Sequence, residues 1–207
     1  IRRAAGMGRA SFEADPDHYE VVHDHCDVLV VGSGPAGLAA AEAAAAAGLD
    51  VVLAEQDFVL GGATLTGLSG DVEGEAPADW RAGRIAGLSA SGVRMWPRTT
   101  AFGLYDHGVV GLLERVTDHL ERPGSLPRER MRIVRAGRIV LATGAMERGF
   151  AFGDNDRPGV MTAAAAAAYV ARLGGAPGQR GVIATKHDSA YRAADTMASA
   201  GSETAQL

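Results

Sequence analysis

Cysteine and lysine are nearly absent from this 207-residue chain, which has one of each, Cys26 and Lys186. A single cysteine excludes an internal disulfide and a C-x-x-C redox pair, and we therefore expect a cytoplasmic protein. The other basic residues are arginines or histidines, and the formal net charge is −5. This balance argues against nucleic acid as a main partner.

An uninterrupted apolar run of membrane-spanning length is also missing. Residues 28–54 are apolar on average, but Pro35, Glu42 and Asp50 interrupt them. We therefore interpret this stretch as a buried strand, helix and strand rather than a membrane span. No signal peptide is visible, and we expect no association with a membrane.

The most informative feature is the run Gly32-Ser33-Gly34-Pro35-Ala36-Gly37, which has the G-x-G-x-x-G pattern of dinucleotide-binding proteins. An apolar strand candidate precedes it, and an alanine-rich helix expected to reach about Ala47 follows. A second strand, 51–53, comes next, and Glu55 stands at its end, 18 residues after Gly37. An acidic residue near this position is part of the fingerprint.

Each residue of the pattern has a physical role in binding a dinucleotide. Gly32 allows a sharp turn out of the strand, Gly34 a close approach of the pyrophosphate, and Gly37 tight packing of the helix on the sheet. The free N–H groups at the helix start attract the phosphates. We expect Glu55 to accept hydrogen bonds from a ribose hydroxyl. NADP is disfavoured, because the Glu55 carboxylate would repel a 2′-phosphate and Gln56 supplies no compensating arginine. A glycine-rich turn without a ligand is the alternative.

Three parts are expected along the chain: a lead-in segment over 1–26, a dinucleotide-binding domain with an inserted hairpin region over 27–150, and the start of a second, truncated domain over 151–207. The further predicted elements are a helix at 80–88, a hairpin region at 93–116, strands at 131–135 and 138–142, a helix at 162–173, a strand at 181–185 and a helix at 189–200. Ala136-Gly137 is predicted to be a turn, and residues 202–207 look too polar for a strand. Because the chain begins with isoleucine and ends soon after a helix, we expect a piece of a longer polypeptide.

The glycine motif, Glu55, Gly61-Gly62 and the later Ala142-Thr143-Gly144 resemble the two-dinucleotide flavoproteins of the glutathione-reductase type. The resemblance implies an α/β, Rossmann-like FAD/NAD(P)-binding fold with a β-hairpin insertion and an incomplete second βαβ unit. It also implies cofactor contacts outside the glycine motif. With the motif and Glu55, the expected cofactor-binding residues are Gly32, Ser33, Gly34, Pro35, Ala36, Gly37, Glu55, Gln56, Gly62, Ala63, Ala101, Thr143 and Gly144. Among these, Ala101 is expected beside the adenine, Gly62 and Ala63 near the phosphates, and Thr143 and Gly144 on the inner side.

Longer runs resemble the alpha subunits of four-subunit sarcosine oxidases: Ile1–Gly6, His25–Gly32, Asn155–Met161 and His187–Arg192. This resemblance implies NAD in the dinucleotide site of this chain, with FAD as the alternative. It implies FAD in a beta subunit, FMN between the two, and gamma and delta subunits as further partners. Such a complex converts sarcosine and oxygen to glycine, formaldehyde (or methylene-tetrahydrofolate) and hydrogen peroxide. An upstream small domain and a downstream folate-binding domain are also implied.

No residue of this chain is predicted to be catalytic or to bind a metal. His18, His23 and His25 lie close in sequence, but solvated surface histidines are expected there rather than ligands. The start of the second unit, 184–189, has no glycine fingerprint, which argues against a second nucleotide. Two alternatives to the sarcosine oxidase hypothesis stay open: a subunit of a related FAD-dependent amine or opine dehydrogenase, and a structural subunit with a non-redox nucleotide.

Overall fold

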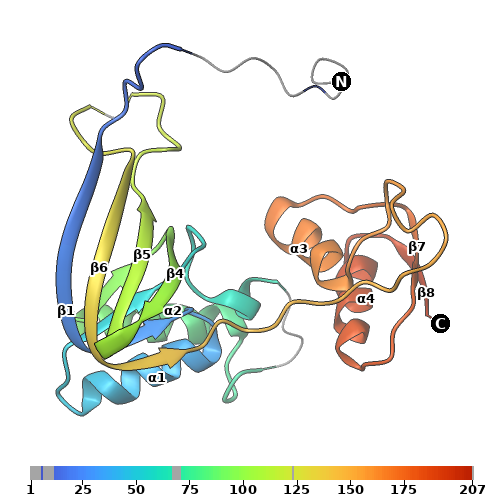
Figure 1. The fold of residues 1–207 in the computed structure, drawn as a ribbon. Coiled ribbons are helices and arrows are strands. Elements are labelled where there is room, and N and C mark those ends of the chain that lie inside the picture. Colours follow the sequence, from blue (N-terminus) through green and yellow to red (C-terminus); the bar gives the residue numbers. More distant parts are fainter. Residues whose placement is uncertain (1–5, 7–11, 67–70, 123, 207) are drawn as a thin grey trace.

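The computed structural model describes residue 6 and residues 12–66, 71–122 and 124–206, which form two α/β units (Figure 1). The larger unit is built on a six-stranded sheet with the order β3-β2-β1-β6-β5-β4, and the smaller one on the parallel pair β7-β8. The elements of the larger unit are β1 (Tyr19–Val31), α1 (Pro35–Ala46), β2 (Val51–Ala54), η1 (Gly62–Leu65), α2 (Pro77–Ala90), β3 (Arg94–Trp96), β4 (Thr99–Tyr105), η2 (Asp106–Gly108), β5 (Val109–Arg115) and β6 (Glu129–Leu141). Those of the smaller unit are α3 (Ala163–Leu173), β7 (Arg180–Ile183), α4 (Ser189–Ser199) and β8 (Glu203–Gln206). Of the runs that carry the resemblance, residues 1–5 lie outside the described part.

The first βαβ unit forms as predicted. β1 and β2 pair in parallel from Val28 opposite Val51 onward, and their valine and leucine side chains are typical of strands buried on both faces. α1 begins at Pro35, where the missing N–H has no helical partner to lose. Gly48 leaves the helix with a φ of +76°, which favours glycine.

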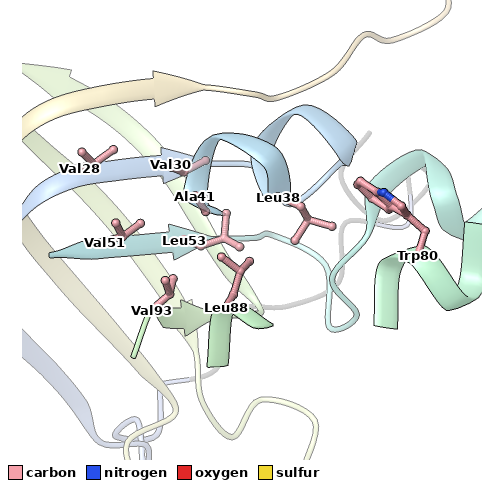
Figure 2. Packing of buried hydrophobic residues seen from close by; sticks show 9 residues of the cluster. All are labelled: Val28, Val30, Leu38, Ala41, Val51, Leu53, Trp80, Leu88 and Val93. Atoms are coloured by element: carbon pink, nitrogen blue, oxygen red, sulfur yellow. The ribbon is translucent and has the colours of Figure 1, made fainter. Parts of the chain in front are cut away.

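Alternate residues of β1 and β2 build two cores on opposite faces of the sheet. Helices α1 and α2 cover the first core, which Figure 2 shows: Val28, Val30, Leu38, Ala41, Val51, Leu53, Trp80, Leu88 and Val93. The second core consists of Cys26, Leu29, Val52, Ala54, Val110, Leu112, Val134 and Ala136. Both cores fix the carboxyl ends of β1 and β2, where the glycine motif and Glu55 begin.

The two longest strands extend beyond the predicted boundaries. β1 starts at Tyr19, inside the segment that we interpreted as a lead-in, and β6 pairs with it in parallel along nearly its whole length. The turn predicted at Ala136-Gly137 was wrong, because β6 runs through both residues. Gly137 instead allows the two strands to approach: a Cβ atom there would lie 2.9 Å from the carbonyl oxygen of Asp27.

The predicted hairpin insertion is confirmed. β4 and β5 pair in antiparallel, and His107 at their tip has a φ of +60°. β5 then pairs in antiparallel with β6, so the hairpin joins the sheet rather than forming a separate layer.

The smaller unit begins with α3, as predicted. The hydroxyl of Thr162 accepts a hydrogen bond from the N–H of Ala165 at 3.3 Å, which caps the helix start. Gly174 ends α3 in the left-handed conformation, with a φ of +67°.

The prediction that residues 202–206 are too polar for a strand was wrong, and residue 207 lies outside the described part. β8 pairs in parallel with β7 from Glu203 opposite Arg180 onward. Ser202 anchors its start, since its hydroxyl donates to the carbonyl oxygen of Gly178 at 2.6 Å. A polar sequence suits this strand because the small sheet has an exposed face, on which Val182 is 67% exposed.

Candidate functional site

The three glycines of the motif meet different surroundings. A Cβ atom on Gly32 would lie 2.3 Å from the carbonyl oxygen of Ala142, and one on Gly37 would lie 1.9 Å from the carbonyl oxygen of Gly32. Only glycine fits at these two positions. At Gly34 no described heavy atom beyond its chain neighbours lies within 4 Å of the Cβ position. Gly32 and Gly37 therefore join β1, β6 and α1, whereas Gly34 borders open space.

The N-terminus of α1 begins at this open space. Pro35 is the first helical residue, and the first bond within the helix runs from the N–H of Leu38 to the carbonyl oxygen of Gly34 at 2.9 Å. The N–H groups of Ala36 and Gly37 therefore have no acceptor within the helix. No acidic residue occupies the first turn, so no side chain of that turn offsets the partial positive charge of the helix end. A phosphate group fits these donors.

A second glycine pair lies against the motif. Gly61 and Gly62 have φ values of +136° and +52°, and η1 starts at Gly62. A Cβ atom on Gly62 would lie 2.8 Å from the Cα atom of Gly34. Ala63, the next residue, is exposed. The structure thus brings together Gly34, Gly62 and Ala63, which the sequence assigned to the phosphates.

The carboxylate of Glu55 ties these two loops together. Its Oε2 atom accepts hydrogen bonds from the N–H and the hydroxyl of Ser33, at 2.8 and 2.6 Å. The same hydroxyl accepts from the N–H of Gly61 at 3.0 Å. Oε1 accepts from the N–H of Asp57 at 2.9 Å. A carboxylate offers about four acceptor positions, so about one stays available on Oε1 for a ligand hydroxyl.

Beyond Glu55, an open pocket of about 500 Å³ lies at the ends of β2 and β5 and the start of β4. It is lined by Gln56, Asp57, Phe58, Thr100 and Arg115. No arginine follows Glu55 in the sequence, but the fold brings one to Gln56 from the end of β5. Nη2 of Arg115 donates to the carbonyl oxygen of Gln56 at 2.9 Å.

Of the other predicted site residues, Ala101 lies in β4, and Thr143 and Gly144 lie after β6. Ala101 is partly buried and packs against the second core, and its neighbour Thr100 lines the pocket instead. Thr143 and Gly144 are exposed just beyond β6. The backbone nitrogen of Thr143 would lie 3.3 Å from a Cβ atom on Gly32, so the end of β6 adjoins the glycine motif.

Helix α3 of the smaller unit contacts the pocket edge through one arginine. The guanidinium of Arg172 pairs with both carboxylate oxygens of Asp57, with 2.9 Å between Nη2 and Oδ1. Its Cζ atom also lies over the ring of Phe58, 5.3 Å from the ring centre. Partial burial raises the pKa of Asp57, but hydrogen bonds from Arg172 and the Val59 N–H hold that pKa below its usual value.

The model of the FAD-dependent oxidoreductase family matches residues 27–133, which carry the glycine motif, Glu55 and the hairpin. The chain belongs to this family. The match covers the part of the chain in which the geometry leaves room for a ligand.

Individual relatives show a closer similarity, to the alpha subunits of sarcosine oxidases. The chain is 48% identical to the sarcosine oxidase subunit alpha of Rhizobium meliloti (strain 1021) over 97% of its own length and 20% of the relative. It is 40% identical to the subunit of that name from Corynebacterium sp. (strain P-1) over 95% of its length and 21% of the relative. The resemblance to sarcosine oxidase alpha subunits is confirmed. The chain spans about a fifth of the length of these curated relatives.

Solved structures confirm the Rossmann-like fold. L-proline dehydrogenase from P. horikoshii superposes with a TM-score of 0.72 at 23% identity, over 95% of this chain and 37% of that one. Thioredoxin reductase from Lactococcus lactis gives a TM-score of 0.59 at 20% identity, over 87% of this chain and 55% of that one. At sequence identities this low, the superpositions show only that the fold is shared.

The described part of the chain shows no candidate metal site and no helix that could span a membrane. Within the described ranges, no helix is both long and apolar enough to cross a membrane. The same ranges hold no group of three or more His, Cys, Asp or Glu residues that could bind a metal ion. His23 and His25 are exposed on β1. Trp80 is buried, and its indole N–H donates to Glu73 at 2.9 Å, as expected of a packing residue.

The predicted site leaves out four residues that line the pocket, Asp57, Phe58, Thr100 and Arg115, and it leaves out Arg172, which contacts Asp57 and Phe58. The available signal for Phe58 was an aromatic residue only three positions after Glu55. Its side chain is exposed in the structure. Arg115 and Arg172 carried none, because only the pairing of β5 with its neighbours and the docking of α3 bring them to Gln56 and Asp57.

Replacing Gly37 by alanine tests the close contact in the motif. The added methyl group would meet the carbonyl oxygen of Gly32, so we expect a loss of about 2–3 kcal/mol in the free energy of unfolding. Gly83→Ala in α2 is the matched control, because its Cβ position is open and alanine favours a helix by about 1 kcal/mol. Denaturant unfolding measures both. Equal stability of the two variants would contradict the packing role of Gly37.

The Asp57–Arg172 pair predicts a pH-dependent coupling. Because the pKa of Asp57 is lowered in the folded state, the stabilisation is present above its unfolded pKa of about 4 and disappears as pH falls through the lower folded value. A double-mutant cycle of Asp57→Asn and Arg172→Met should give a coupling of about 1 kcal/mol at pH 7 that shrinks below pH of about 4.

The exposed pair Arg157–Asp154 serves as the control for that cycle, because both side chains are mostly solvated. Asp154→Asn and Arg157→Met should show no measurable coupling at either pH. A coupling between Asp57 and Arg172 that stayed constant down to pH 3 would argue against ionisation of Asp57 as its source.

Proposed function

We propose that this chain is the dinucleotide-binding part of a sarcosine oxidase alpha subunit. The observation that carries the proposal is the 48% identity to such a subunit over 97% of the chain, which includes both α/β units. The glycine motif supports it, because Gly34 borders open space at the N-terminus of α1 and Gly62 lies directly against Gly34. On this proposal, residues 27–150 form the nucleotide domain, and residues 151–207 start a second one.

The proposed complex contains beta, gamma and delta subunits beside this one. With molecular oxygen as the oxidant and one water, it oxidatively demethylates sarcosine to glycine, formaldehyde and hydrogen peroxide. When tetrahydrofolate accepts the methylene group, methylene-tetrahydrofolate forms in place of formaldehyde and no water is consumed. FAD in the beta subunit and an FMN are the flavins of the proposed reaction. We expect this chain alone to be inactive, since a flavin supplies the redox chemistry and the amine pocket is expected on another subunit. We also propose that the complex is cytoplasmic.

The dinucleotide of this chain is proposed to be NAD, and FAD is the second candidate. The match to an FAD-dependent oxidoreductase model favours FAD, in a subunit related to amine or opine dehydrogenases. Either molecule would place its pyrophosphate at Gly34 and the start of α1, and a ribose hydroxyl at Oε1 of Glu55. When bound, a redox-active dinucleotide supplies a hydride acceptor. The protein residues hold and orient it.

Release of the bound nucleotide from the full-length, coexpressed complex tests the proposal. Each subunit is separated, denatured without hydrolysis, and its nucleotide identified by mass and absorbance. NAD from the subunit that carries this chain would support the sarcosine oxidase proposal with a largely structural nucleotide. FAD from it would favour a flavin dehydrogenase subunit. A subunit that neither retains nor binds either dinucleotide would overturn the proposal.

Glu55→Ala probes the proposed ribose contact. The variant loses the charged acceptor, so we expect dinucleotide affinity to fall by about 1–3 kcal/mol. Because Glu55 also holds Ser33, the control is Ser33→Ala, which loosens the same loop and keeps the carboxylate. Isothermal titration of the full-length protein measures both. If Ser33→Ala weakens binding as much as Glu55→Ala, Glu55 acts through the loop and not on the ribose.

A further inference from the structure

Phe58 is an aromatic residue that the cores do not use. Its side chain is 63% exposed, although it lies three residues after Glu55, at the end of a fully buried strand. It belongs to neither core cluster of the larger unit. Single exposed apolar side chains are common on protein surfaces. Phe58 is distinguished by its place close after Glu55, and by the contacts of its ring.

One contact holds the Phe58 ring from the smaller unit. The guanidinium of Arg172 lies over the ring, with Cζ 5.3 Å from its centre, and the same group pairs with Asp57. A cation over an aromatic ring and a two-point pair with the adjacent residue restrict both the loop and the ring. The ring is therefore positioned, and much of its surface stays open.

The open surface of Phe58 belongs to the pocket beyond Glu55. The other described lining residues are Gln56, Asp57, Thr100 and Arg115. Arg172 is not one of them. The pocket lining begins at Gln56, directly after the carboxylate proposed to hold the ribose, and it includes no residue of the glycine motif. A group attached to that ribose and pointing away from the phosphates would enter it.

We propose that Phe58 is a stacking platform for the base of the bound nucleotide, and that Arg172 positions this platform from the smaller unit. The inference rests on the proposed function and deepens it, because it names the residues that recognise the base. The ring provides a flat apolar face for a purine, and Arg172, which lies over the ring, is not among the residues that line the pocket. The base subsite of the larger unit then depends on docking of α3.

Affinity measurements on the full-length protein, stripped of nucleotide, test the proposal with two probes. ADP-ribose reports on base, ribose and phosphates together, and inorganic pyrophosphate reports on the glycine loops alone. Phe58→Ala should weaken ADP-ribose about tenfold and leave pyrophosphate unchanged, because base stacking on an aromatic ring contributes on that scale. Phe58→Tyr should retain the affinity for ADP-ribose. Arg172→Met should weaken ADP-ribose less than Phe58→Ala does, and also leave pyrophosphate unchanged.

Phe102→Ala is the matched control, since Phe102 is 54% exposed on β4 and does not line the pocket. It should leave both affinities unchanged. An ADP-ribose affinity of Phe58→Ala equal to that of the unmodified protein overturns the inference, as does a loss that pyrophosphate shares. If Phe58→Ala instead releases another subunit while ADP-ribose binds normally, the ring is a protein contact and the inference fails. Failure of the unmodified protein to bind ADP-ribose, NAD or FAD would instead overturn the proposed function.

Discussion

The contact between α1 and the turn that precedes it is the constraint on which the rest of the structure depends. At Gly37 the helix backbone comes so close to the carbonyl oxygen of Gly32 that no side chain fits, and Gly32 meets the end of β6 in the same way. These two approaches bring a helix start, a strand end and a returning strand to one point. The start of α1, whose first N–H groups have no acceptor within the helix, consequently lies beside the open space at Gly34.

Glu55 extends this constraint to the next loop. One carboxylate accepts from Ser33 and Asp57, and the Ser33 hydroxyl that it holds accepts in turn from Gly61. An acidic side chain buried at the end of a strand is stable here because backbone and hydroxyl donors compensate its desolvation. The same donors orient it, so the acceptor position left for a ligand is fixed before any ligand binds. Binding then requires little ordering of this loop.

The loop after Glu55 also contacts the smaller unit. Asp57 and Phe58 lie on the pocket, and Arg172 of α3 contacts both. At the other end of α3, the N–H of Ala164 donates to the carboxylate of Glu147 in the connection between the units, at 2.8 Å. The placement of the smaller unit and the shape of the pocket are therefore linked through specific polar contacts, and in the described part of the chain no buried apolar cluster includes residues of both units.

The sequence by itself determined the first βαβ unit, the hairpin, both helices of the smaller unit, and the positions of the glycine motif and Glu55, because each depends on local pattern and turn chemistry. It misjudged Gly137, since a glycine that permits close strands looks locally like one that makes a turn. It missed β8, whose polar residues form a strand only because β7 offers a paired edge. Only the tertiary structure decided that Arg115 lines the pocket beside Gln56 and that Arg172 pairs with Asp57. Such contacts join residues 59 and 115 positions apart, and no local pattern encodes a distance of that kind.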